Sequence, residues 1–257
     1  MELRVLGVSG GLAASAETTA FLLEQHILFD GGTGVGQLSQ QQMCDIDTLV
    51  LTHAHLDHIC GAALMLATTI DKRSSPLTIY APEAVLTVLR KHLFNWQIWP
   101  DFSVLPTEES AVLRYKAVEP EESFEIAGIT LEAVPLSHTV PSFAYIASRG
   151  DRSFCFCGDT AATERLWQRI NSRGGVDQLF IELSYPQERA AIAVQAGHYD
   201  TVTLARDLAK LEKPLQLNLM HAKPGYEEQL RVEVENQTGL EQLAVRHCQL
   251  GDRFNVL

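Results

Sequence analysis

Residues 46–58 of the chain are IDTLVLTHAHLDH, so a short apolar run leads directly into three histidines and an aspartate. The β-branched and apolar composition of Ile46–Leu51 is typical of a buried strand. Imidazole and carboxylate groups are the ligands that borderline divalent metals prefer. Three imidazoles and a carboxylate gathered after one strand therefore predict a metal centre rather than a histidine-rich surface loop.

The spacing within the cluster indicates two metals rather than one. In an extended segment, residues two apart point the same way, so His53 and His55 are placed to bind one ion. Asp57 and His58 lie where the chain turns into a helix expected over Ile59–Thr69, so they point elsewhere and suit a second ion. Gly61 supplies a small residue where that helix passes close to the site.

The composition narrows the class of protein. The chain has 257 residues, 46% hydrophobic and 20% charged, with a formal net charge of −12. No linker, repeat or low-complexity segment interrupts it, so we expect one globular domain over residues 1–257. The negative charge argues against a nucleic-acid polymer as partner, because such binding needs clustered Lys and Arg. A small anionic substrate is compatible, since metal ions supply positive charge locally.

The chain shows no segment typical of membrane insertion or export. No apolar run approaches the ~20 residues of a transmembrane helix. Residues 1–6, MELRVL, lack the basic start and long apolar stretch of a signal peptide. We therefore expect a cytoplasmic location and no association with a membrane.

Strand-like and helix-like runs intermix along the whole chain, and polar residues recur where strands end. This alternation, with antiparallel-looking strand runs, predicts an α/β (α+β) fold. Ligands gathered at one edge of a sheet are typical of an α/β active site. The residues at strand ends are His138 after Ile129–Leu136, Asp159 after Ser153–Cys157, Glu182 near the end of Gln178–Leu183, and His221 after Leu215–Met220.

The order of these residues resembles that of the metallo-β-lactamase superfamily. The match consists of HxHxDH at residues 53–58, followed by His138, Asp159 and His221. The resemblance implies a four-layer αβ/βα sandwich with a dinuclear site between two sheets. It implies that one metal is bound by His53, His55 and His138 and the other by Asp57, His58 and His221, with Asp159 bridging both. Zn²⁺ suits these ligands, and Mn²⁺ or Fe²⁺ are alternatives.

Further segments are similar to the class II 3′,5′-cyclic-nucleotide phosphodiesterases. They include HAHLDH at 53–58, HLFNWQIWP at 92–100, IELSYP at 181–186, AGH at 196–198 and HAKP at 221–224. This resemblance implies hydrolysis of cAMP or cGMP to the 5′-nucleotide by a hydroxide held between two metals. We expect Asn95 and Trp99 to contact the substrate, with Trp99 stacking on the base.

Three residues are predicted to take part in the chemistry beside the metals. Asp57 is expected to orient the nucleophile. Glu182 and His198 resemble the Glu–His pair of the tRNA 3′-processing nucleases. We expect His198 to stabilise the phosphoryl group or protonate the leaving oxygen, with Glu182 orienting it. A local capping role for His198 is the alternative.

Other functions remain open at this stage. The first alternative is a tRNase Z-like enzyme or another hydrolase of small phosphodiesters. Those nucleases carry a long basic arm between the third histidine and the bridging aspartate, whereas only 20 residues separate His138 from Asp159. A lactonase or thioesterase leaves the phosphodiesterase-like segments unexplained. A flavodiiron-type oxidoreductase would have Glu in place of His55, and a binding module would normally have lost ligands. Dimerisation is an expectation from the family alone.

Overall fold

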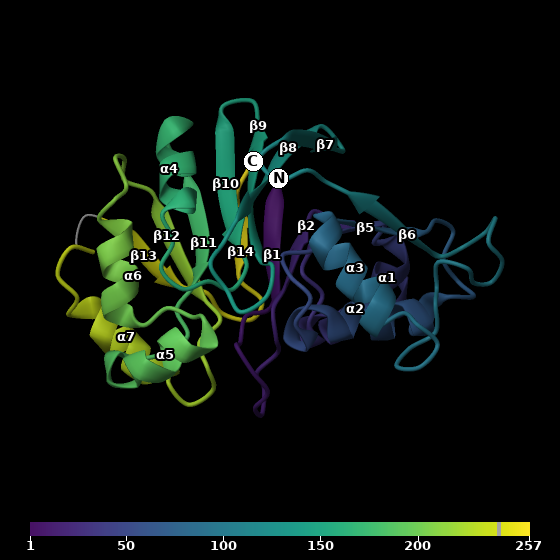
Figure 1. The fold of residues 1–257 in the computed structure, drawn as a ribbon, viewed down its shortest axis with the longest axis horizontal. Coiled ribbons are helices and arrows are strands. Elements are labelled where there is room, and N and C mark those ends of the chain that lie inside the picture. The colour runs from purple at the N-terminus through teal and green to yellow at the C-terminus, as the bar shows by residue number, and fades with distance from the viewer. Residues whose placement is uncertain (241–242) are drawn as a thin grey trace.

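The computed structural model describes residues 1–240 and 243–257, which form two seven-stranded sheets with helices on their outer faces (Figure 1). The four-layer α/β sandwich expected from the sequence is confirmed. None of the helices in these two ranges is long and apolar enough to cross a bilayer.

The first sheet is antiparallel at one side and parallel at the other. Its strand order is β14 (Arg253–Asn255), β1 (Glu2–Gly7), β2 (Ala20–Leu23), β3 (Ile27–Phe29), β4 (Thr48–Val50), β5 (Leu77–Ala81) and β6 (Leu113–Ala117). Strands β14 to β3 pair antiparallel, and β3 to β6 pair parallel. Its outer face is covered by α1 (Gln40–Asp45), α2 (Leu56–Thr69) and α3 (Glu83–His92) (Figure 1).

The second sheet repeats this arrangement with a different set of strands. Its order is β13 (Ala244–His247), β12 (Gln216–Met220), β11 (Gln178–Glu182), β10 (Arg152–Cys157), β9 (Phe143–Arg149), β8 (Ile129–Pro135) and β7 (Ser123–Ile126). Strands β7 to β10 pair antiparallel, and β10 to β13 pair parallel. The helices on its side are α4 (Arg165–Ser172), α5 (Ala190–Ala196), α6 (Thr201–Leu208) and α7 (Glu227–Glu235) (Figure 1).

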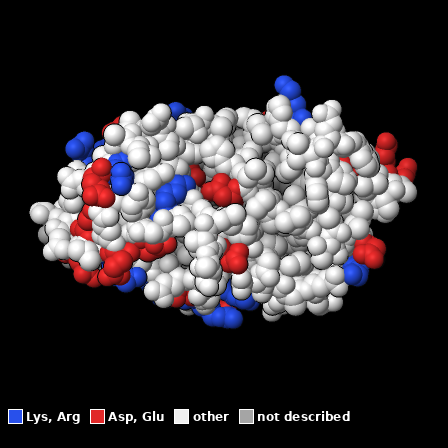
Figure 2. Space-filling model, turned by 90° about the horizontal axis from the view of Figure 1, so that it is seen from below, with Lys and Arg blue, Asp and Glu red and all other residues white. Residues whose placement is uncertain are grey.

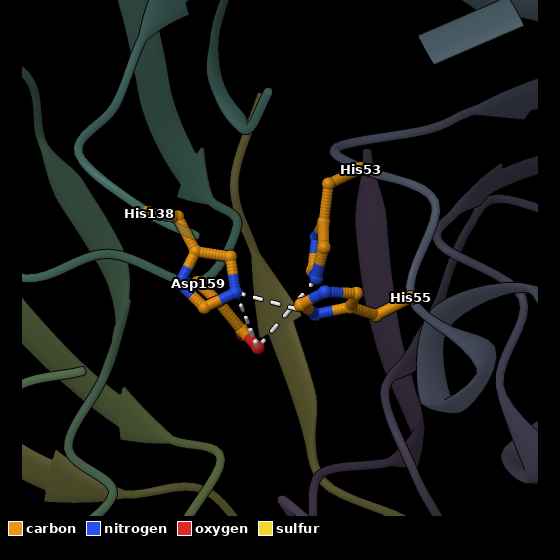
Figure 3. Close-up of side chains that lie close together, drawn as sticks. All are labelled: His53, His55, His138 and Asp159. Atoms are coloured by element: carbon orange, nitrogen blue, oxygen red, sulfur yellow. Dashed lines mark hydrogen bonds and ion pairs between the residues drawn. The ribbon is translucent and has the colours of Figure 1, made fainter. Parts of the chain in front are cut away.

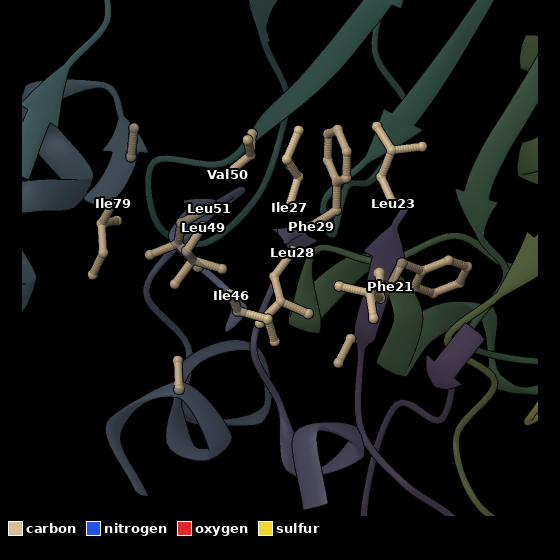
Figure 4. Packing of buried hydrophobic residues seen from close by; sticks show 14 of the residues in the cluster. Phe21, Leu23, Ile27, Leu28, Phe29, Ile46, Leu49, Val50, Leu51 and Ile79 are labelled. Atoms are coloured by element: carbon tan, nitrogen blue, oxygen red, sulfur yellow. The ribbon is translucent and has the colours of Figure 1, made fainter. Parts of the chain in front are cut away.

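Aromatic side chains join the two sheets in one core. The rings of Phe21 and Phe29 lie 5.1 and 5.3 Å from that of Phe156, and Phe29 lies 5.6 Å from Phe154. Figure 4 shows the aliphatic side chains of the first sheet that pack beside Phe21 and Phe29. A second apolar cluster, which includes Trp167 and Leu204, lies between the second sheet and its helices. Both sheets are therefore held with their strand ends at fixed positions.

Several elements differ from those expected from the sequence. Strands β6 and β7 and helix α1 were not expected, because their residues are polar and largely exposed, so no apolar period marks them. A short 3₁₀ helix, η1 (Thr33–Gln37), follows the glycines after β3, and a second one, η2 (Gln187–Arg189), precedes α5. Two short strands, β13 and β14, end the chain and belong to different sheets.

Gly61 lies where α2 crosses the segment between β3 and η1. A Cβ atom at Gly61 would lie 1.9 Å from the backbone oxygen of Gly32, whereas one at Gly36 would meet nothing within 4 Å. Gly61→Ala is therefore expected to lower the free energy of unfolding by about 1–3 kcal/mol. Gly36→Ala is the matched control and is expected to have a far smaller effect. Urea unfolding of both variants measures this, and equal stabilities would contradict it.

Candidate metal centre

The predicted ligands lie at one edge of the two sheets, after strands from both. His53 follows β4, and His55 is the N-cap residue of α2. Asp57 and His58 lie in the first turn of that helix, as the sequence predicted. From the second sheet, His138 follows β8, Asp159 follows β10 and His221 follows β12. The site is thus assembled between the two sheets from segments far apart in the sequence.

The first group consists of His53, His55, His138 and Asp159, whose ligand atoms all lie within 4.8 Å of one another. Figure 3 shows the four side chains converging from opposite sheets. His138 Nε2 lies 3.2 Å from His55 Nδ1 and 3.9 Å from Asp159 Oδ2. His53 Nε2 lies 3.6 Å from the same carboxylate oxygen.

The second group consists of Asp57, His58, Asp159 and His221, also within 4.8 Å. Asp159 Oδ1 lies 3.3 Å from His221 Nε2 and 3.4 Å from His58 Nε2. The two imidazole nitrogens are 3.2 Å apart. Asp159 therefore faces the first group with one oxygen and the second group with the other, as the bridging role requires.

The donor atoms fit divalent metal ions. His53 Nε2 is buried and has no hydrogen-bond partner among the described residues, a costly state unless a further group binds there. Neighbouring groups hold the outer nitrogens of four imidazoles and so turn the other nitrogen toward the site. The pairs are His53 Nδ1 with Thr52 Oγ1, His58 Nδ1 with Asp30 Oδ2, His138 Nδ1 with Gly197 O, and His221 Nδ1 with Ser184 Oγ.

The protonation of the site also favours a cation. Burial lowers the pKa of His53, His55 and His138, which keeps these imidazoles neutral and able to donate a lone pair at neutral pH. Burial opposes the charge of Asp159, but His221 and His58 hold the pKa of its carboxyl well below the ordinary value. The first group therefore offers neutral nitrogens beside the charged oxygens of Asp159.

One side of the site is open. The side chain of Asp57 is 29% exposed, whereas those of His58, His221 and Asp159 are at most 3% exposed. Leu56, beside Asp57, is 67% exposed. A substrate is therefore able to approach from the Asp57 side, where this carboxylate borders both the metal site and solvent.

His198 and Glu182 form the ion pair that the sequence predicted, and His198 lies beside one ligand of each group. His198 Nδ1 lies 2.8 Å from Glu182 Oε1, and its ring centroid lies 5.2 Å from His138 and 5.5 Å from His221. Burial alone would lower the pKa of His198, but the Glu182 carboxylate raises it. The imidazole is therefore suited to carry a proton beside the metal site.

The structure does not bring Asn95 and Trp99 into either metal group. Asn95 Oδ1 accepts from the backbone nitrogens of Gln97 and Ile98, and its Nδ2 donates to Lys91 O. Trp99 Nε1 donates to Ala63 O. These contacts build the loop after α3 and pack it on α2, so the expected contact of either residue with substrate stays a prediction.

The sequence interpretation missed three polar residues behind the ligands. Asp30 is fully buried and binds His58 Nδ1 at 2.7 Å, Thr52 Oγ1 at 2.8 Å and Thr52 N at 2.8 Å. Ser184 and Thr52 contact His221 and His53. Asp30 directly follows strand β3, and a polar residue after an apolar strand is the signal that identified His138 and Asp159, so the same signal would have identified Asp30.

Comparisons with known proteins agree with this geometry. The family model described as "Beta-lactamase superfamily domain" matches residues 25–222. A probable 3′,5′-cyclic-nucleotide phosphodiesterase of Yersinia pestis is 30% identical over 71% of this chain and 59% of that protein. A ribonuclease Z of Pyrococcus horikoshii is 29% identical over 66% of this chain and 57% of its own length. The chain thus spans less than two thirds of these two relatives.

Solved structures extend the similarity to the whole fold. The structure of unliganded yeast PDE1 superposes with a TM-score of 0.80 over 98% of both chains, at 20% identity. At this level of identity the comparison concerns the fold alone. The arrangement of sheets and helices is therefore shared well beyond the residues that the family model matches.

Proposed function

Because this chain belongs to the β-lactamase superfamily, we propose that it is a metal-dependent phosphodiesterase that hydrolyses 3′,5′-cyclic nucleotides to 5′-nucleotides. The proposal rests on the two ligand groups that share Asp159. The ion pair between Glu182 and His198 lies beside these groups. Such a site supplies positive charge where a phosphodiester needs it and a proton donor for the leaving oxygen.

The metal would be held by the seven residues of the two groups. When bound, divalent ions there supply Lewis acidity that polarises a phosphoryl oxygen and lowers the pKa of a water molecule. Zn²⁺ is our first choice because the set combines imidazole and carboxylate donors, and Mn²⁺ and Fe²⁺ accept the same donors.

The chain's own residues supply the remaining steps. His198 holds a proton because Glu182 stabilises its charged form, and Nδ1 is the nitrogen bound to Glu182. Its Nε2 is therefore left to donate a proton to the departing sugar oxygen. Asp57, ionised and partly exposed, orients the attacking water as a hydrogen-bond acceptor. Burial raises the pKa of Asp57, but hydrogen bonding to His221 and the charge of His58 outweigh it, so the carboxyl pKa is lowered.

A small substrate is favoured over a nucleic-acid polymer. The segment from His138 to Asp159 consists mainly of the β9–β10 hairpin, closed by the pair Arg149 and Arg152, and has no inserted arm. Lys and Arg side chains are scattered on the face shown in Figure 2, where acidic groups gather toward one end. Binding a polymer through many phosphate contacts needs a continuous basic surface instead.

Processing of tRNA 3′ ends is the second candidate. It is favoured by the similarity to ribonuclease Z and by the Glu182–His198 pair, which resembles the pair of those nucleases. Both reactions break a phosphodiester, so the metal groups alone do not discriminate between them. A cytoplasmic location and a homodimer stay predictions.

Turnover of purified, metal-loaded protein tests the proposal. We expect hydrolysis of 3′,5′-cAMP or cGMP at rates above those for 2′,3′-cyclic nucleotides and a precursor tRNA. Bis-p-nitrophenyl phosphate serves as the control for an intact metal site. Cleavage of the precursor tRNA without cleavage of any 3′,5′-cyclic nucleotide would replace our first choice by the second.

A further inference from the structure

Glu182 is a buried carboxylate whose two oxygens are both engaged. Its side chain is fully buried at the end of β11. Oε1 accepts from Thr160 N and from His198 Nδ1, both at 2.8 Å. Oε2 accepts from Ser184 Oγ at 2.5 Å and from Tyr199 N at 3.4 Å. The charge therefore acts directly on His198, and through Ser184 on a further residue.

That further residue is the metal ligand His221. Ser184 Oγ lies 3.2 Å from His221 Nδ1 in a fully buried environment. A hydroxyl has one proton, and the short contact with a carboxylate is the strongest place for it. The lone pairs of Ser184 Oγ then accept a hydrogen bond, so His221 Nδ1 is the donor. His221 Nε2 then faces the second ligand group, 3.3 Å from Asp159 Oδ1 and 3.4 Å from Asp57 Oδ2.

Two longer contacts of Ser184 Oγ do not change this assignment. His198 Nδ1 lies 3.4 Å away, but its proton goes to the nearer Glu182 Oε1 at 2.8 Å. The carbonyl oxygen of His221 lies 3.1 Å from Ser184 Oγ, and as a neutral acceptor it competes poorly with the carboxylate. The remaining donor that faces Ser184 Oγ is His221 Nδ1.

The first sheet contains the same arrangement built from other residues. Asp30 binds His58 directly and reaches His53 through the hydroxyl of Thr52. Glu182 binds His198 directly and reaches His221 through the hydroxyl of Ser184. In each half of the site, one carboxylate thus orients two imidazoles, one by contact and one through a hydroxyl.

The backbone of His221 is restrained, but the orientation of its ring depends on side-chain contacts. The residue has a φ of 64°, in the left-handed region that residues other than glycine rarely adopt, and its nitrogen donates to Val8 O at 2.7 Å. These restraints fix the Cα position but not the rotation of the ring. Ser184 Oγ is the hydrogen-bond partner of Nδ1 among the described residues, so it restrains the ring from the side opposite to the contacts of Nε2 with Asp57 and Asp159.

We propose that Ser184 is a positioning residue, which connects Glu182 to His221 and holds the ring with Nδ1 donating to Ser184 and Nε2 turned toward the second ligand group. The inference rests on the metal binding that the proposed function requires. A carboxylate–hydroxyl–imidazole connection of this kind changes the affinity of the site for metal, although Ser184 would contact neither metal nor substrate. Loss of such an outer contact typically weakens metal binding by about 10–100-fold.

The first test is the hydrogen bond of His221 Nδ1 in metal-free protein. Nitrogen NMR of ¹⁵N-histidine-labelled protein, assigned with a His221→Gln variant, is expected to show a proton on Nδ1 that exchanges slowly with water in the parent chain. Ser184→Ala removes one oxygen atom and is expected to remove this slowly exchanging Nδ1–H signal. Thr69→Val removes an equally buried hydroxyl from the far end of α2 and is expected to keep the signal.

The second test is Zn²⁺ binding, measured by competition with a chromophoric chelator. Ser184→Ala is expected to bind one of two equivalents about 10–100-fold more weakly, while Thr69→Val keeps both. Parental affinity for both equivalents in Ser184→Ala overturns the proposal. If the parent chain binds no metal, the proposed function fails, and the NMR measurement then decides the positioning role: an unchanged Nδ1–H signal in Ser184→Ala overturns it.

Discussion

Asp159→Asn is expected to lower phosphodiester turnover roughly a thousandfold, because metal ions contribute several kcal/mol to such reactions and each ~1.4 kcal/mol is a factor of ten. The substitution keeps the shape of the side chain and removes the negative charge. That charge faces His221 and His58 with one oxygen and His53 and His138 with the other. Both ligand groups therefore lose their only common member.

The measurement combines turnover with metal analysis of the dialysed protein. Asp159→Asn is expected to retain less than the parental metal content, and turnover is expected to fall with it. Asp151→Asn is the matched control, because Asp151 is exposed in the turn between β9 and β10. A variant that retains two equivalents of metal and full turnover would show that Asp159 does not join the two groups.

His198→Ala is expected to lower turnover by about 10²–10⁴-fold while leaving the metal content unchanged, as loss of a general acid does. His198 lies beside both metal groups but contributes to neither, and Glu182 raises its pKa above the ordinary value. An acid must be protonated to act, so turnover of the parent chain falls as pH rises through this raised pKa. The variant is expected to lose that alkaline decline.

The control for this variant is His92→Ala, since His92 is exposed at the end of α3. Rate profiles between about pH 5 and 9 and metal analysis are compared for the three proteins. Full activity in His198→Ala would contradict the role of His198 as a general acid and leave it as a structural contact of Glu182. A loss of metal together with activity would instead assign His198 to the maintenance of the metal groups.

The sequence predicted the elements that carry the site better than it predicted the edges of the sheets. A buried strand ends where its apolar run ends, so His138, Asp159 and His221 were visible as polar residues after such runs. Strand β6 and helix α1 lie at the periphery with exposed polar residues, and tertiary packing rather than a local pattern forms them.

The residues behind the ligands show where sequence reasoning reaches its limit. Ser184 follows a predicted strand and resembles any serine in a loop. Its role depends on a distance to His221, which follows the neighbouring strand β12. Asn95 shows the opposite case, because its polarity suggested a ligand contact but its side chain bonds its own loop. The polarity of a residue identifies it as a candidate site residue, but the fold determines which group its side chain contacts.

Because the ligands extend from His53 to His221, the affinity of the site for metal depends on whether this whole part of the chain is folded. The first sheet contributes four ligands and the second contributes three, and each group contains ligands from both sheets, so an ion bound in either group would connect the two sheets. A chain in which β12 has not docked lacks His221 and binds one ion poorly. Metal added in excess stabilises the closed form by mass action. If ions occupy the two groups, we expect the rate of their release to report how often the two sheets separate.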